Sequence, residues 1–201
     1  MRINRKVKKR PPLRLIQGNV PHKISVGSVT IIAAPEDKPP FTAEAVVFEE
    51  DTFLVLSADR TVLEPHEHPI RIMTEAFNIS PKKTGSVMVK GKHPFCLFAI
   101  IHDLNQEPSW KEEWIARALD GIFQEVESRN IQSLALPFLG TLHGTLQKHR
   151  FVKLFGCALK RMAHNRLKRI WLMLPAGTSD TIITLLDSEL GRKKKVQKRK
   201  N

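Results

Sequence analysis

The loop PFLGTLHG, at residues 137–144, combines residue types that can hold a negatively charged group. Its centre consists of Gly140, Thr141, Leu142, His143 and Gly144. Glycine lets a backbone approach a ligand closely or adopt a positive φ, and N–H groups of such a loop can bind a phosphate. A tight turn in which glycine is needed for steric reasons is the alternative, because two glycines are a weak signal.

A basic segment follows this loop. Residues 148–169 hold eight lysine and arginine residues and no acid. We take five of them as candidates for contacts with nucleic acid: Lys148, Arg150, Lys153, Lys160 and Arg161. A helix beginning beside the loop would direct its N-terminal dipole, with Lys148 or Arg150, at the same anion. The alternative is a basic helix face that only contacts solvent.

The two ends of the chain are more basic still. Residues 1–14 carry seven basic residues and no acid, and residues 191–201 carry another seven and no acid. The whole chain has 33 basic and 20 acidic residues. Residues 15–190 hold 19 of the basic residues and all 20 acidic ones, so this body has a net charge of −1. Such tails would release counterions from a nucleic acid backbone and bind RNA or DNA without reading its sequence. A solubility or targeting role is the alternative.

Other chemistry has little support in the sequence. His66 and His68 flank Glu67, but no cysteine cluster or third ligand accompanies this pair, so we predict no metal site. Cys96 and Cys157 lie in apolar stretches without a histidine partner, which predicts reduced core residues and no thiol nucleophile. No Ser-His-Asp arrangement has a recognisable spacing. We therefore expect no catalytic residues and no cofactor.

The location of the protein is predicted from two features. No positively charged segment followed by an apolar one opens the chain, which argues against secretion. The apolar run FCLFAII, at 95–101, is far shorter than a membrane span. The tails also lack the apolar face of a helix that lies on a membrane. We expect a cytoplasmic or nuclear protein that does not bind membranes.

The first half of the body is predicted to form strands. Short apolar or alternating runs of strand length are 23–32, 45–48, 52–57, 85–89 and 95–101. The last of these is apolar enough to be buried on both faces of a sheet. Prolines and charges predict a loop at 35–41 and an irregular segment at 63–69, and a short helix is expected at 70–77.

The second half alternates helices and strands. Ser109 and Glu112 have the S-x-x-E spacing of a capping box, and an apolar stripe at helical spacing follows them. A strand at 131–136, a helix at about 146–165, a strand at 170–174 and a helix from about 178 to 190 complete the order. This alternation predicts an α/β fold with a mixed, mostly parallel sheet covered by helices.

Several of these segments together resemble the second half of a macro domain. They are the strand at 85–89, the run FCLFAIIHDL, the capped helix with Trp110 and Trp114, and the run NIQSLALPFLGTLHG, and they cover roughly residues 80–190. The resemblance implies a three-layer α/β/α sandwich with a cleft for ADP-ribose or a related nucleotide. It places residues 140–144 at the diphosphate loop of that cleft.

The first half departs from the macro domain pattern. Ser28 stands where the family has an aspartate that binds adenine. The segment that contacts the distal ribose is best matched by Val55, Leu56, Ser57, Ala58 and Asp59. Leu56 and Asp59 replace two asparagines there, and no glycine-rich loop follows. Unpaired polar groups of a buried ligand cost about 1–3 kcal/mol each, so these departures argue against hydrolysis of ADP-ribose derivatives.

We therefore predict one macro-like domain at residues 20–190 between basic tails at 1–19 and 191–201. The predicted role is non-catalytic binding of RNA or DNA through the tails and the helix at 148–169, with a phosphate or nucleotide site in the 140–144 loop. Two alternatives remain open. One is an enzyme or binding protein for ADP-ribose derivatives with an atypical first loop, and the other is a protein-interaction scaffold with an empty cleft.

Overall fold

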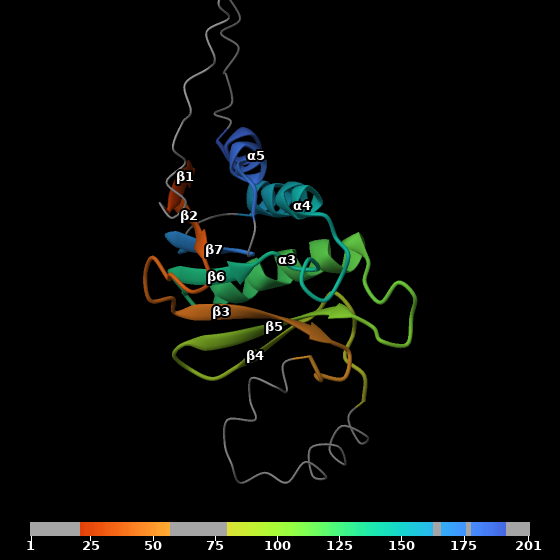
Figure 1. Cartoon of the computed structure of the whole chain (residues 1–201). Coiled ribbons are helices and arrows are strands. Elements are labelled where there is room, and N and C mark those ends of the chain that lie inside the picture. Colours follow the sequence, from red (N-terminus) through yellow and green to blue (C-terminus); the bar gives the residue numbers. More distant parts are fainter. Residues whose placement is uncertain (1–20, 57–79, 163–165, 176–177, 192–201) are drawn as a thin grey trace, which may run out of the picture.

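The computed structural model describes residues 21–56, 80–162, 166–175 and 178–191. Both basic tails apart from Gly191, the His66–His68 segment and the helix expected at 70–77 lie outside the described residues. The domain boundaries predicted at residues 20 and 190 therefore stay a prediction. Within the described part, strands and helices follow one another much as the sequence predicts (Figure 1).

Seven strands form one sheet. Their bounds are β1 His22–Val26, β2 Val29–Pro35, β3 Ala45–Asp51, β4 Val87–Lys90, β5 Phe95–His102, β6 Ser133–Pro137 and β7 Arg169–Leu174. The order across the sheet is β1-β2-β7-β6-β3-β5-β4. The four inner pairings are parallel, and the edge pairings β1/β2 and β4/β5 are antiparallel. The mixed, mostly parallel sheet is confirmed, and the carboxyl ends of β3, β6 and β7 meet at one edge.

Two predicted strands differ from the structure. The run 23–32 forms a hairpin, because Gly27 adopts a φ of +58° and allows the chain to turn between β1 and β2. The predicted strand at 52–57 is wrong for its described part, since residues 52–56 form a turn and a bend after β3. Side chains of β3 itself bind the backbone of that turn, as described below.

Three helices lie side by side on one face of the sheet. They are α3 Glu112–Ser128, α4 Lys148–Arg161 and α5 Asp180–Leu190, and α4 contacts both of the others. The helix–strand alternation of the second half is thereby confirmed. The capping box is wrong, because α3 begins after Lys111 and no side chain caps it. Ser109 lies two residues before that position, with its Oγ 3.5 Å from His102 Nδ1.

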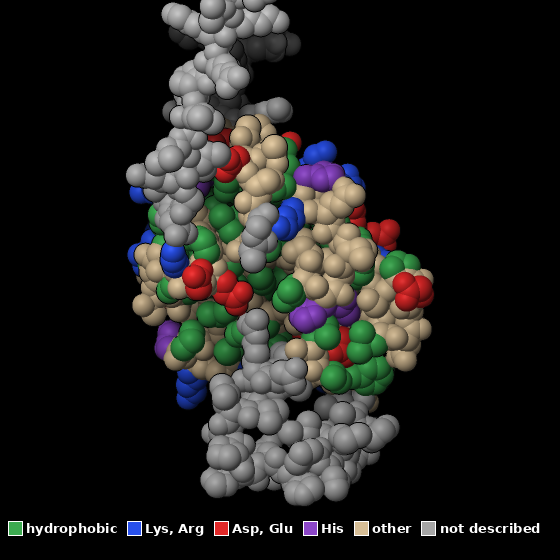
Figure 2. All heavy atoms as spheres, viewed as in Figure 1, with side chains coloured by type: hydrophobic (Ala, Val, Ile, Leu, Met, Phe, Trp, Pro, Cys, Tyr) green, Lys and Arg blue, Asp and Glu red, His purple; other side chains and the backbone are tan. Residues whose placement is uncertain are grey.

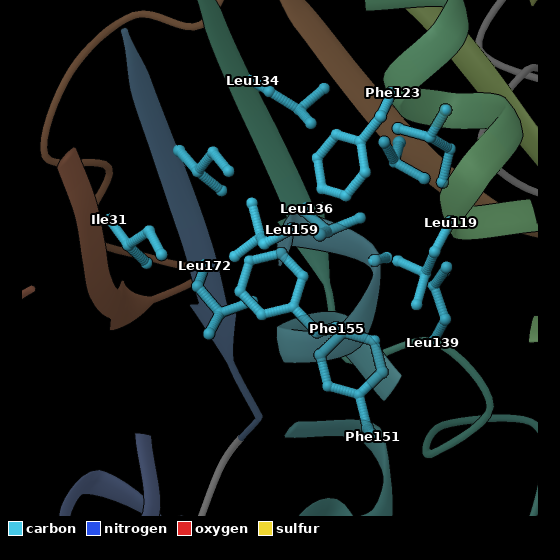
Figure 3. Packing of buried hydrophobic residues seen from close by; sticks show 14 of the residues in the cluster. Ile31, Leu119, Phe123, Leu134, Leu136, Leu139, Phe151, Phe155, Leu159 and Leu172 are labelled. Carbon is cyan, nitrogen blue, oxygen red and sulfur yellow. The ribbon is translucent and has the colours of Figure 1, made fainter. Parts of the chain in front are cut away.

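The core between the helices and the sheet is made by the predicted apolar stripes. Phe151 and Phe155 of α4 are fully buried, and their rings stack with centroids 6.0 Å apart. In Figure 3 the ring of Phe155 lies beside Leu172 of β7, and the ring of Phe151 lies next to that of Phe155. A smaller apolar cluster around Trp171 lies separately, packed against Phe41. The core fixes the position of α4 and therefore of the 137–147 connection that leads into it.

Candidate functional site

A hollow of about 300 Å³ lies at the carboxyl ends of β3, β6 and β7. Ligand sites of open α/β sheets form at such ends, where loops follow the strands. The apolar part of its wall is formed by Val47, Phe48, Leu56, Pro137, Phe138, Leu142, Met173, Leu174 and Pro175. The remainder is formed by Glu36, Glu49, Thr141 and His143. The cleft is thus mainly apolar, and no lysine or arginine is among the described residues that line it.

Glu49 of β3 is directed at the loop that follows β6. Its side chain is 6% exposed. One carboxylate oxygen accepts a hydrogen bond from the N–H of Gly140 at 2.8 Å, and the other accepts from the N–H of His143 at 3.3 Å. These are two of the N–H groups that the sequence offers to a phosphate. In this structure a carboxylate of the protein is bound to them.

His102, at the end of β5, completes this cluster. The imidazole is 1% exposed, and its Nε2 lies 2.6 Å from a carboxylate oxygen of Glu49. Because an ionised carboxylate only accepts hydrogen bonds, Nε2 is the donor. The rings of His102 and His143 are perpendicular, with centroids 6.3 Å apart. Glu49 is therefore held from two sides, by the buried imidazole and by the loop.

The two acids that follow Glu49 bind the other loop beside the cleft. The Asp51 carboxylate accepts hydrogen bonds from the N–H groups of Phe53, Val55 and Leu56 at 2.6–2.9 Å. Glu50 accepts from the N–H of Leu56 at 2.8 Å. Both acids are fully buried. Residues 52–56 turn away from the sheet because these hydrogen bonds replace the strand pairing that the sequence predicts.

The glycines of the 140–144 loop have a packing role. Gly140 has a φ of +77°, and a Cβ placed on it would lie 2.5 Å from Cδ1 of Ile115. A Cβ on Gly144 would lie 2.5 Å from the carbonyl oxygen of Gly140. The turn predicted as the alternative therefore explains both glycines. Of the other three residues, Thr141, Leu142 and His143 line the cleft, and the Thr141 hydroxyl donates to the carbonyl of Phe138 at 2.8 Å.

The segment matched to the distal-ribose contacts is only partly described. Val55 is 49% exposed and lies outside the cleft lining, whereas Leu56 belongs to that lining. Ser57, Ala58 and Asp59 lie outside the described residues. The sequence interpretation missed Glu49 and the pairing role of His102. A signal was present, since three consecutive acids at the end of an apolar strand need hydrogen-bond partners once they are buried.

The five candidate nucleic acid contacts all lie on α4, and two are held by ion pairs with α3. Arg150 makes two hydrogen bonds to Glu112, at 2.8 and 2.6 Å. Arg161 makes two hydrogen bonds to Asp120, at 3.2 and 2.7 Å. Lys148 reaches the hydroxyl of Thr178 at 3.4 Å. Lys153 and Lys160 lie seven residues apart, and both are exposed on the side of α4 that faces away from the core.

Positive and negative side chains are mixed on the visible face of the molecule (Figure 2). On the face shown in Figure 2, basic side chains are scattered among acidic and apolar ones. The hydrogen bond from Arg150 keeps the pKa of Glu112 below its ordinary value of 4.5. The same contact raises the pKa of Arg150. The basic charge of α4 is thus partly neutralised by its neighbour α3.

Three further expectations concern metals, cysteines and membranes. Across the described ranges, no three His, Cys, Asp or Glu side chains are arranged to hold a metal ion. Cys96 is half-buried and Cys157 is exposed, so the prediction that both are core residues is wrong; both are free thiols. Within the same part of the chain, none of the helices has the length and apolar character needed to cross a bilayer.

Comparison with solved structures identifies the fold. The macrodomain of Oceanobacillus iheyensis with MES bound matches with a TM-score of 0.62 at 15% identity, over 86% of this chain and 96% of that one. The same macrodomain with ADP matches with a TM-score of 0.61 at 15% identity, over 84% and 94%. The macro domain of ganglioside induced differentiation associated protein 2 matches with a TM-score of 0.59 at 9% identity, over 81% and 85%.

These similarities show that the chain has the macro domain fold. The resemblance drawn from the second half of the sequence is thereby confirmed at the level of the fold. No protein-family model matches the chain, and no curated protein matches it. At 9–15% identity the solved structures establish the architecture alone.

Proposed function

We propose that the protein binds a small ligand of the nucleoside or nucleotide class in the cleft at the ends of β3, β6 and β7, without transforming it. The observation that carries this proposal is the hollow of about 300 Å³ with a mainly apolar wall. That volume is at the lower end of the usual range for ligand sites, about 300–1,000 Å³. A planar base could pack against side chains such as Phe48 and Met173, with polar partners at the rim.

The identity of the ligand class is supported by the fold. The Oceanobacillus iheyensis macrodomain, whose structure aligns with 84% of this chain, has been solved with ADP. Binding without catalysis is supported because two polar side chains of the cleft, those of Glu49 and Thr141, already make hydrogen bonds within the protein. Glu49 is bound to two N–H groups and an imidazole, and the Thr141 hydroxyl is bound to a backbone carbonyl.

Calorimetry with adenosine, ADP and ADP-ribose tests the proposal. We expect saturable binding of at least one of them to the wild-type chain. Leu56→Trp should abolish it, because Leu56 lines the hollow and indole would fill it. Val55→Trp is the matched control, since Val55 is 49% exposed and does not line the hollow. No heat with any of the three ligands at millimolar concentration would reject the proposal, as would equal loss in both variants.

Nucleic acid binding is the second candidate function. It is supported by fourteen basic residues in residues 1–14 and 191–201. It is also supported by Lys153 and Lys160, which are exposed on α4 and which no described acid pairs with. Cations of this kind bind the phosphate backbone of RNA or DNA electrostatically. Lys153 and Lys160 do not line the cleft, so contacts through these two residues would leave it open to a small ligand.

A further inference from the structure

We infer that Glu49 takes the place of a ligand phosphate in the 140–143 loop, so that the cleft prefers a nucleoside-type ligand without a phosphate to its phosphorylated form. This inference rests on the proposed function and narrows its ligand class. It makes Glu49 a specificity-determining residue of the cleft. Its basis is the geometry of one buried carboxylate and the composition of the wall around it.

Two N–H groups of the 140–143 loop are already bound to an anionic group of the protein. A loop at the carboxyl end of a parallel strand, followed by a helix, offers N–H groups to an anion. Here the anion is already present, because Glu49 accepts from Gly140 at 2.8 Å and from His143 at 3.3 Å. A phosphate at that position would have to displace a carboxylate that is 6% exposed and also bound to His102 at 2.6 Å.

The charged side chains in the described wall of the hollow are acidic. Glu36 and Glu49 both line the hollow, and none of its described lining residues is a lysine or arginine. A phosphate entering beside Glu49 would meet a like charge in a partly desolvated place, where repulsion is stronger than in water. No lysine or arginine among the described lining residues would offset this repulsion. An uncharged ligand meets neither obstacle.

The loop at residues 52–56, on the other side of the cleft, is also bound by acids of β3. The N–H groups of Phe53, Val55 and Leu56 donate to Asp51, and that of Leu56 also to Glu50. Three consecutive acids of β3 therefore supply the anionic partners of both loops that border the hollow. The N–H groups of Gly140, His143, Phe53, Val55 and Leu56 are thus bound within the protein, and the remaining space is bounded mainly by apolar side chains.

Calorimetry with inorganic pyrophosphate and with adenosine tests this inference. The chains compared are the wild type, Glu49→Ala, Glu49→Gln and the control Glu36→Gln. Glu49→Ala should raise the affinity for pyrophosphate by at least about tenfold, because it frees the two N–H groups and removes the charge. Glu49→Gln should also raise the affinity for pyrophosphate. Glu36→Gln removes a charge from the same wall without freeing these N–H groups, and should raise the affinity for pyrophosphate less than Glu49→Ala does.

The outcomes separate the inference from the proposed function. If Glu49→Ala did not fold, as judged by its thermal transition, Glu49→Gln decides, since it keeps the shape of the side chain. Pyrophosphate binding that is no tighter in the folded Glu49 variants than in the wild type overturns the inference. An equal gain in Glu36→Gln also overturns it, because charge alone would then explain the effect. Adenosine binding to the wild type tests the proposed function separately, whatever the result with pyrophosphate.

Discussion

At the scale of single residues, the cleft is defined by where buried acids find their hydrogen bonds. Burying a carboxylate is costly unless it is paired, and Glu49 has three partners within 3.3 Å. These partners come from β5 and from the loop after β6, so one side chain joins three segments that are distant in the sequence. The loop conformation thus depends on Glu49 as well as on its glycines.

Gly140 provides a test of that loop. Gly140→Ala should destabilise the fold by about 2–4 kcal/mol, since it combines a positive φ with overlap against the buried Ile115. Gly27→Ala is the control, because Gly27 also has a positive φ but a Cβ there meets nothing within 4 Å. It should cost about 1 kcal/mol. Denaturant unfolding measures both, and equal losses would contradict the packing role assigned to Gly140.

At the scale of elements, the second half of the chain was predictable and the end of β3 was not. Local patterns specify α3 and α4, because Trp114, Ile115, Phe151 and Phe155 recur at helical spacing and are all buried. The fate of Glu49 depends on N–H groups about 90 residues away, which no local pattern contains. The capping box failed for a related reason: the helix begins later, and Ser109 lies beside His102.

The contact between α3 and α4 is testable by pH. Arg150 lowers the pKa of Glu112 through their hydrogen bond, so the unfolded chain binds a proton more readily than the folded one. The stabilisation is therefore present above the ordinary pKa of 4.5 and is lost as the pH falls below it. Glu112→Gln should lower the melting temperature at pH 7 by only about 1 °C, since both side chains are partly exposed.

The melting temperatures of the wild type and Glu112→Gln are also compared at pH 3. There the difference between wild type and Glu112→Gln should be smaller than at pH 7, because the unfolded chain takes up the proton first and the stabilisation by Arg150 is lost as the pH falls. Glu113→Gln is the matched control, an exposed acid in the same helical turn, whereas the ion pair of Arg150 is made with Glu112. A gap of the same size at pH 7 and pH 3 would show that the ion pair does not cause it.

At the scale of the whole molecule, charge and cleft are separate features. Of the 33 basic residues, 14 lie in residues 1–14 and 191–201 and five on α4, whereas the described wall of the cleft carries acids and apolar groups but no lysine or arginine. Two of the α4 cations are held by α3, which leaves Lys153 and Lys160 as the stronger candidates for contacts with nucleic acid. The body therefore adds less to polyanion binding than its sequence suggests.

Salt dependence tests the nucleic acid proposal. Fluorescence anisotropy with a labelled single-stranded RNA or duplex DNA should give an affinity that falls steeply as salt rises. Removing residues 1–14 and 191–201 should weaken binding most. Replacing Lys153 and Lys160 by Gln should reduce the slope of log affinity against log salt by about 1–2, at about 0.7–0.9 per phosphate contact. Arg150→Gln with Arg161→Gln is the control and should change it less. Binding that is insensitive to salt would reject the proposal.

The central claim is that the cleft at the ends of β3, β6 and β7 is the ligand site and that Glu49 fills its anion-binding loop. Amide NMR of the ¹⁵N-labelled wild-type chain during a titration with adenosine tests this most directly. We predict saturable shifts at Leu56, Phe138 and Thr141, while the Gly140 N–H keeps the downfield position of a donor to a carboxylate. Shifts confined to another face of the protein, or none at millimolar adenosine, would contradict the claim.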